Sequence, residues 1–260
     1  MKITAVVPAR ISSTRLPEKP LAMIGDKPLI QWVYENVSHS RYVNEVIVAT
    51  DSERIVAAVN QFGGKAVLTS PDHPSGTDRV AEVAKRLDAD VLLNVQGDEP
   101  FISKEVIDEV LRFMVKDTHI EMASAKTHLK DIKELFSSSV VKVICNEDDF
   151  AIYFSRAPIP YFRDEYDSYK RTGKVDTKLQ SILNTGVYKH IGIYAYRWDF
   201  LMKFTKMKPT FLEKAEKLEQ LRALEKGVKI KVPTVKYDGF GIDTKEDLER
   251  ANKILKGKAL

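Results

Sequence analysis

The chain has 260 residues, enough to bury a sizeable core in one large domain or in two lobes. Its 41 basic and 37 acidic residues are mixed along the whole length, and no basic tract or helix-turn-helix pattern favours nucleic acid as a partner. Cys145 is the only cysteine, which excludes an intrachain disulfide and a cysteine-based zinc site. No apolar run approaches about 18 residues and the first strand begins without a signal peptide, so we expect a cytoplasmic protein with no membrane partner.

The first half of the chain alternates between apolar strands and amphipathic helices. Apolar runs rich in β-branched residues predict strands at 3–9, 44–50, 65–70 and 90–97. Helical spacing of apolar residues predicts helices at 28–40, 52–62 and 75–87. Strands that are apolar throughout and separated by helices are typical of a parallel sheet covered on both faces. We therefore predict an α/β fold with a mostly parallel, doubly wound sheet.

After residue 120 the alternation becomes less regular. Four further strands are predicted at 121–128, 140–146, 150–156 and 187–197. Residues 163–187 are polar and aperiodic, which favours a mobile arm or lid. Residues 210–227 predict one strong helix, with Thr210 as its N-cap and Gly227 at its end.

The loop after the first strand, "PARISSTRLPEKP", carries three long cations, Arg10, Arg15 and Lys19. Ligands of an open parallel sheet bind beyond the carboxyl ends of its strands, where this loop begins. It contains no G-x-G-x-x-G motif, so a nicotinamide dinucleotide is a weak hypothesis. Arginine forks and a lysine point charge suit the oxygens of a polyphosphate chain. The loop alone leaves open the alternative of three solvated surface cations.

Two acidic residues are candidates for binding a metal next to that phosphate chain. Asp98 follows the apolar strand directly in "VQGDEP", which places its carboxylate at the ligand edge of the sheet. Asp243 lies in "GFGIDTKEDLER", after two glycines. Magnesium bridging a polyphosphate usually takes one or two protein carboxylates and keeps several waters. Each residue has a competing interpretation as a helix cap, with Thr244 as the alternative cap beside Asp243.

Seven stretches together resemble the 3-deoxy-manno-octulosonate cytidylyltransferase family. They are spread over nearly the whole chain in the family's order, and the combination is more specific than any single motif. The stretches are "PARISSTRLPEKPL", "SGTDR", "NVQGDEP", "YFSRAPIP", "KHIGIYAYR", "AEKLEQLRALEKG" and "GIDTKEDL".

The resemblance implies a two-lobed nucleotidyltransferase fold, a requirement for Mg²⁺, a homodimer, and a role in making the lipopolysaccharide precursor CMP-Kdo. Residues 1–120 would form the CTP-binding α/β core. Residues 121–232 would form a smaller lobe for sugar binding and dimerisation, including the arm 163–187. Residues 233–260 would return to the core with the second metal carboxylate. The arm looks longer than the family pattern, which makes sugar selectivity and the dimer contact the least certain features.

The resemblance also implies roles for individual residues. Lys19, Asp98 and Asp243 would be catalytic, and the two aspartates would bind the metal. The residues implied to bind CTP are Arg10, Arg15, Lys19, Ser75, Gly76, Arg79 and Gln96. Those implied to bind the acidic sugar are Arg156, His190, Tyr194, Glu219 and Gln220. From the residues alone, a packed core histidine and ordinary polar positions on an amphipathic helix remain open for the last four.

The expected reaction joins CTP to 3-deoxy-D-manno-octulosonate (Kdo) and releases pyrophosphate. Two alternatives belong to the same class: a cytidylyltransferase for the 8-amino derivative of Kdo, and one for another acidic sugar such as a sialic acid. A different class, a non-catalytic nucleotide-binding regulator, is disfavoured by the presence of Lys19, Asp98 and Asp243.

Overall fold

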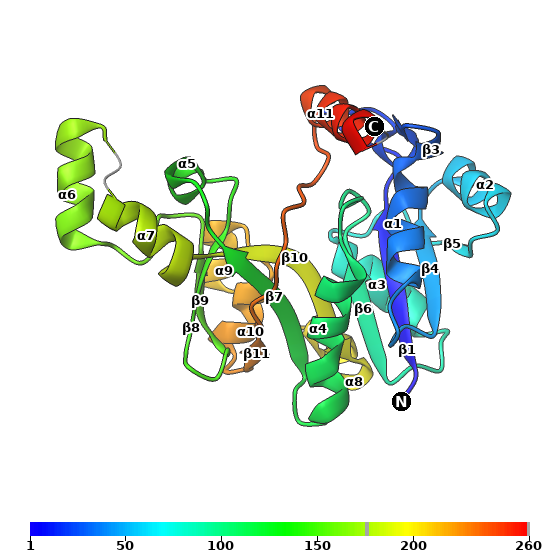
Figure 1. Cartoon of the computed structure of the whole chain (residues 1–260). Helices are drawn as coiled ribbons and strands as arrows, with labels where there is room; N and C mark the ends of the chain where they lie inside the picture. The colour runs from blue at the N-terminus through cyan, green and yellow to red at the C-terminus, as the bar shows by residue number, and fades with distance from the viewer. Residues whose placement is uncertain (175–176, 259–260) are drawn as a thin grey trace.

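The computed structural model describes residues 1–174 and 177–258 (Figure 1). Within them, one nine-stranded sheet runs through the molecule. Its strands are β1 (Ile3–Ala9), β4 (Glu45–Thr50), β5 (Ala66–Leu68), β6 (Val91–Val95), β7 (Met122–His128), β8 (Lys142–Cys145), β9 (Ala151–Ser155), β10 (Tyr188–Arg197) and β11 (Ile230–Lys231). A separate two-stranded hairpin is formed by β2 (Met23–Ile24) and β3 (Lys27–Pro28).

The strand order is β11-β7-β10-β6-β1-β4-β5, with β8 pairing to β10 and β9 pairing to β8. β5, β4, β1 and β6 are parallel neighbours, whereas β10 is antiparallel to both β6 and β7. The predicted strands therefore form, and the mostly parallel α/β sheet is confirmed. β10 joins the two halves of the chain in one continuous sheet.

Helices cover both faces of the sheet because neighbouring strand residues point to opposite sides. Val7 packs in one core with α1 (Leu29–Ser38), α2 (Glu53–Gln61) and α4 (Lys104–Lys116). Val6 packs in a second core with three other helices. These are α3 (Gly76–Ala84), α8 (Trp198–Phe204) and α10 (Gln220–Glu225). The doubly wound arrangement is therefore confirmed.

Residues 163–187, predicted to be an aperiodic arm, contain two helices, α6 (Arg163–Thr172) and α7 (Thr177–Gly186). They project away from the sheet beside α5 (Ile132–Phe136) (Figure 1). Buried apolar residues of the arm pack with residues of α5 in a third, small core. The arm has few apolar residues, but these order it by packing against residues that are distant in the sequence. Residues 175–176 of the predicted arm lie outside the described residues.

The predicted single helix 210–227 is wrong, because the segment forms α9 (Phe211–Glu216) and α10 with a break between them. Lys217 adopts a left-handed conformation with φ 55° and ends α9. Thr210 is the N-cap, as predicted, and forms a capping box with Glu213. After the break, Gln220 contacts Tyr194 of β10 and Glu219 contacts the start of α3.

The last part of the chain returns from one end of the molecule to the other. After β11, an extended segment leads to α11 (Lys245–Lys258), which packs over the β2–β3 hairpin (Figure 1). Along this return the backbone of Ile242 donates a hydrogen bond of 2.8 Å to the carbonyl oxygen of Asp98. Asp243 is thereby brought beside the end of β6.

Candidate active site

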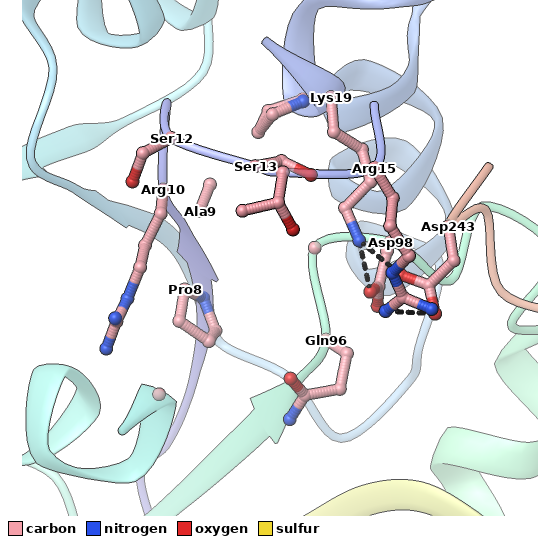
Figure 2. Close-up of a pocket in the computed structure, with 14 residues that line it drawn as sticks. Pro8, Ala9, Arg10, Ser12, Ser13, Arg15, Lys19, Gln96, Asp98 and Asp243 are labelled. Carbon is pink, nitrogen blue, oxygen red and sulfur yellow. Dashed lines mark hydrogen bonds and ion pairs between the residues drawn. The ribbon is translucent and has the colours of Figure 1, made fainter. Parts of the chain in front are cut away.

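A cavity of about 380 Å³ opens at the carboxyl ends of β1 and β6, the edge predicted from the sheet order. A short 3₁₀ helix, η1 (Lys19–Leu21), closes the cationic loop on one side. The residues drawn in Figure 2 line this cavity, and include Pro8, Arg10, Arg15, Lys19, Gly76, Gln96, Asp98 and Asp243. A Cβ at Gly97 would lie 2.7 Å from the carbonyl oxygen of Pro8, so the close approach of the two strand ends requires glycine there.

Four charged side chains form a chain of ion pairs on one side of the cavity (Figure 2). The ammonium of Lys19 donates to Asp98 at 2.7 Å and to Asp243 at 2.9 Å. The second oxygen of Asp243 lies 3.1 Å from the guanidinium of Arg15. Desolvation alone would lower the pKa of Lys19, but the two carboxylates outweigh it and raise that pKa above its usual value. Lys19 is therefore charged at neutral pH.

Neither aspartate is a helix cap, which removes the competing interpretations. The N-cap of α4 is Ser103, five residues after Asp98. At the start of α11 the Thr244 hydroxyl accepts from the backbone of Asp247, and the Asp247 carboxylate accepts from the backbone of Thr244. Asp243 is left with its carboxylate directed at Lys19.

The donor set fits a hard divalent cation. Asp98 and Asp243 approach a single positive centre from two elements far apart in sequence, and both reach it within hydrogen-bonding distance. Among the described residues no group of three or more His, Cys, Asp or Glu converges on one point. Two carboxylates, with water and substrate oxygens completing the shell, are the usual protein contribution to a magnesium–phosphate site.

The three predicted cations do not point to one place. Arg10 lies across the cavity from Lys19 (Figure 2), and its guanidinium donates to the backbone carbonyl of His73 at 2.5 Å. Arg15 and Lys19 are near each other through Asp243. The loop thus offers one cation beside the end of β5 and two beside the carboxylates.

Arg79, predicted to contact CTP, is fully buried and does not line the cavity. Its guanidinium lies 3.2 Å from Asp51, and the other oxygen of Asp51 accepts from the backbone of Ile11 at 3.1 Å. A direct contact of Arg79 with CTP stays a prediction. In this structure Arg79 supports the beginning of the cationic loop through Asp51. A local motif does not reveal this role, because Asp51 lies at the end of another strand.

A second cavity, of about 490 Å³, shares Asp98 and Asp243 with the first. Three of the five predicted sugar-binding residues line it, namely His190, Tyr194 and Gln220. The hydroxyl of Tyr194 donates to Gln220 at 3.1 Å, whereas the buried side-chain nitrogen of Gln220 has no hydrogen-bond partner among the described residues. An unpaired buried donor is costly, so a ligand oxygen in this cavity would stabilise it.

His190 is held by the strand next to it. Its Nε2 lies 2.7 Å from the hydroxyl of Ser124, which is also 2.8 Å from the carbonyl oxygen of Ile193. If the serine donates to that carbonyl, Nε2 carries the imidazole proton and Nδ1 is left as an acceptor. Desolvation lowers the pKa of His190 to about 3, so the ring is neutral.

The other two predicted sugar residues face elsewhere. Glu219 accepts a hydrogen bond of 2.6 Å from Thr77 and lies 3.2 Å from the hydroxyl of Ser75, the N-cap of α3. It thus connects the start of α3 with the start of α10. The guanidinium of Arg156 donates to the carbonyl oxygens of Ser138 and Glu216, both at 2.8 Å, and does not line the cavity. A contact of Arg156 with the sugar stays a prediction.

Glu99 and Tyr237 were missed by the sequence reasoning, although both line the second cavity. The tyrosine hydroxyl donates to the Glu99 carboxylate. Desolvation raises the pKa of Glu99 to about 7, although the bond from Tyr237 opposes the shift. Glu99 stood inside the "QGDEP" motif, but its partner lies 138 positions later. Only the return of the chain brings them together.

No helix among the described residues is long and apolar enough to span a membrane. A family model described as cytidylyltransferase matches residues 4–230. The 3-deoxy-manno-octulosonate cytidylyltransferase of Geotalea uraniireducens is 50% identical over 256 residues, which cover 98% of this chain and 100% of the relative. The protein of the same name from Geotalea daltonii is 48% identical over 258 residues, or 99% and 100% of the two chains.

One solved structure is similar over the whole fold. It is a CMP:2-keto-3-deoxy-manno-octonic acid synthetase complexed with CTP, with a TM-score of 0.89 and 39% sequence identity. The match covers 99% of this chain and 100% of that one. Identity at this level over full-length relatives confirms the resemblance found in the seven stretches of sequence. The chain therefore belongs to the cytidylyltransferase family and, within it, to the 3-deoxy-manno-octulosonate cytidylyltransferases, which are nucleotidyltransferase enzymes.

Proposed function

We propose that this enzyme transfers CMP from CTP to the anomeric 2-hydroxyl of 3-deoxy-D-manno-octulosonate, releases pyrophosphate, and so supplies lipopolysaccharide biosynthesis. The observation that carries the proposal is the position of Asp98 and Asp243 on the common border of two cavities. A phosphate chain in one cavity and a sugar in the other would meet at these carboxylates. Family membership, and the complex of the similar synthetase with CTP, support the same pair of substrates.

In the first cavity, the residues present suit a nucleoside triphosphate. One narrow wall of the cavity, away from the ion pairs, is formed by Pro8, Gly76 and Gln96. A Cβ on Gly76 would lie 3.3 Å from the Pro8 ring. A flat base fits such a wall. Arg15 and Lys19 lie on the side of the carboxylates and are proposed to bind the phosphates that leave.

In the second cavity, the polar groups suit a polyhydroxylated acid. Gln220 offers an unpaired amide donor and neutral His190 an acceptor. Lys189 also lines the cavity and pairs with Glu134 at 2.5 Å. Arg156 holds the carbonyls at the rim, from where we propose that it assists in binding the sugar's carboxylate.

The proposed reaction is an in-line displacement. The oxygen of the sugar's 2-hydroxyl forms a bond to the α-phosphorus, the bond from that phosphorus to the bridging oxygen of the β-phosphate breaks, and the hydroxyl proton is released. Asp98 and Asp243 would hold Mg²⁺, which supplies charge stabilisation at the phosphoryl oxygens when bound. The protein's own task is to orient both reactants and to neutralise the pyrophosphate with Lys19 and Arg15.

Pyrophosphate release tests the proposal. Each of the four nucleoside triphosphates is incubated with Mg²⁺ and one of a panel of acids: Kdo, its 8-amino derivative and a sialic acid. We expect CTP with Kdo to give the highest kcat/KM. Faster turnover of another acid would reassign the substrate. Binding of CTP without turnover of any acid would indicate a regulator instead of an enzyme.

A further inference from the structure

The two carboxylates proposed to bind the metal already share a cation that belongs to the protein. The ammonium of Lys19 lies 2.7 Å from Asp98 and 2.9 Å from Asp243. Its side chain is only 17% exposed, so the ammonium is enclosed between them. Arg15 contacts the remaining oxygen of Asp243 at 3.1 Å. The metal-binding oxygens therefore face protein cations.

A divalent metal and this ammonium would compete for one position. Magnesium takes carboxylate oxygens at about 2.0–2.1 Å, so an ion shared by Asp98 and Asp243 would lie in the space between them that Lys19 Nζ now fills. With neither cation present, the two carboxylates would repel each other across that space. One positive charge at this position is therefore needed to keep both carboxylates in place.

Lys19 also lines the first cavity, which we propose binds the triphosphate. A lysine is a point charge on a flexible stem and turns from one anion to another without a fixed fork geometry. A triphosphate in the cavity would offer the ammonium several anionic oxygens.

From these contacts we propose that Lys19 is an exchangeable counter-ion of the metal site. In the free protein it holds Asp98 and Asp243 together and excludes the metal, and the arriving triphosphate draws it away and frees both carboxylates. The displacement of Lys19 by the triphosphate rests on the proposed function. The competition between Lys19 and a divalent cation is a property of the free protein.

Binding of Mn²⁺ to the free protein, followed by electron paramagnetic resonance without nucleotide or sugar, tests the competition. Lys19→Met should bind Mn²⁺ at least about tenfold more tightly than the wild type, the change expected when one charge-assisted hydrogen bond no longer has to be broken. Lys27→Met is the matched control, because Lys27 pairs with Glu35 at 2.7 Å and does not line the cavity. It should bind Mn²⁺ as the wild type does. Equal or weaker binding by Lys19→Met would overturn the proposal.

Thermal melting gives a second readout. In EDTA, Lys19→Met should melt below the wild type, because Asp98 and Asp243 then repel each other, and Mn²⁺ should restore much of the loss. If Lys27→Met has a lower melting temperature than the wild type, Mn²⁺ should not raise it again. A loss in Lys19→Met that Mn²⁺ leaves unchanged would contradict the counter-ion role. If Lys19→Met does not fold, Lys19→Gln is used for both measurements.

Adding CTP separates this inference from the proposed function. At one CTP concentration, Mn²⁺ affinity should rise more in the wild type than in Lys19→Met, because no ammonium has to leave the variant's site. An equal rise in both proteins would overturn the exchange. If calorimetry shows that neither protein binds CTP, the proposed function fails, whereas the nucleotide-free titration still decides whether Lys19 competes with the metal.

Discussion

Asp98 and Asp243 reach one ammonium from elements far apart in the sequence, and their exchange for asparagine should show what each contributes. Changes to groups that merely support metal ligands lower affinity or activity by about 10–100-fold, so loss of a ligand itself should reduce kcat by more than about a hundredfold. Asp98→Asn and Asp243→Asn should keep the circular dichroism spectrum of the wild type. A folded Asp243→Asn enzyme with a normal rate and normal Mg²⁺ dependence would exclude that residue from the site.

His190 should make stability depend on pH. Its pKa in the folded protein is about 3 against an ordinary 6.5, so the unfolded chain binds a proton that the folded one rejects. The stability due to the neutral ring is complete above about pH 6.5 and is lost as the pH falls toward 3, by at most about 1.4 kcal/mol per pH unit.

Urea unfolding of the wild type and of His190→Gln at several pH values between 4 and 7 measures this contribution. The difference between their unfolding free energies should shrink as the pH falls. Parallel curves for the two proteins would mean that His190 is protonated in the folded state as readily as in the unfolded state.

At the scale of secondary-structure elements, Lys142 fixes the position of one wall of the second cavity. It is fully buried in β8, and its ammonium donates to the carbonyl oxygens of Ser137, Val140 and Arg156 at 2.9, 2.6 and 2.7 Å. These bonds fix the loop between α5 and β8, whose residues Ser139 and Val140 line the cavity.

Lys142→Met should therefore lower the unfolding free energy by roughly 2–3 kcal/mol, because carbonyls are left without their charged donor. The KM for the sugar should rise, whereas the Kd for CTP should stay constant. Lys65→Met is a suitable control, since its ammonium pairs with Glu45 at the surface. Loss of CTP affinity in Lys142→Met would show that the loop serves the other cavity.

The elements were predictable where local pattern and tertiary contacts agree. The parallel strands were found because they are apolar throughout. Asp98 was predicted because it follows a strand end closely, and Lys19 because it is one of three long cations in the loop after the first strand. The break in the helix 210–227 was not predictable, because the helical spacing of apolar residues continues through Lys217. Its left-handed conformation is accompanied by contacts of Glu216 with Ser155 and Arg156, about 60 positions earlier.

The same reason limits how much of the site the sequence shows. Arg79 has the sequence position of a nucleotide ligand, but its charge is taken up by Asp51 from a neighbouring strand. The sequence did not mark Glu99 as a site residue, because its hydrogen-bond donor, Tyr237, is brought to it by the segment that returns to the core. Pairings across the sheet, which a single sequence does not contain, decide which polar side chains face a ligand.

At the scale of the whole molecule, the homodimer stays a prediction, and β9 offers a place to test it. Among the described strands, β9 pairs with β8 alone, and apart from an isolated bridge between Phe150 and Lys231 its other edge is unpaired. Ile152 on this strand is 61% exposed. Open edges of this kind are ready sites for pairing with another chain.

Light scattering should give the wild type twice the 29.5 kDa mass of one chain. Ile152→Glu should shift the protein toward the monomer at the same concentration, because a charge is costly to bury in an interface. A monomeric wild type would rule out the homodimer, and an unaffected variant would move the interface away from this edge.

The distance of 224 positions between Lys19 and Asp243 also has a consequence during synthesis. At the usual 5–20 residues per second, Lys19 leaves the ribosome roughly 10–45 s before Asp243, and Asp98 roughly 7–30 s before it. Throughout that interval the nascent chain has its cationic loop but lacks one of the two carboxylates proposed to bind the metal. The match of the family model ends at residue 230, so a product released there would contain all of the matched region. Such a product would lack Asp243, one of the two aspartates proposed to hold the metal, so we expect the last thirty residues to decide when the newly made protein becomes active.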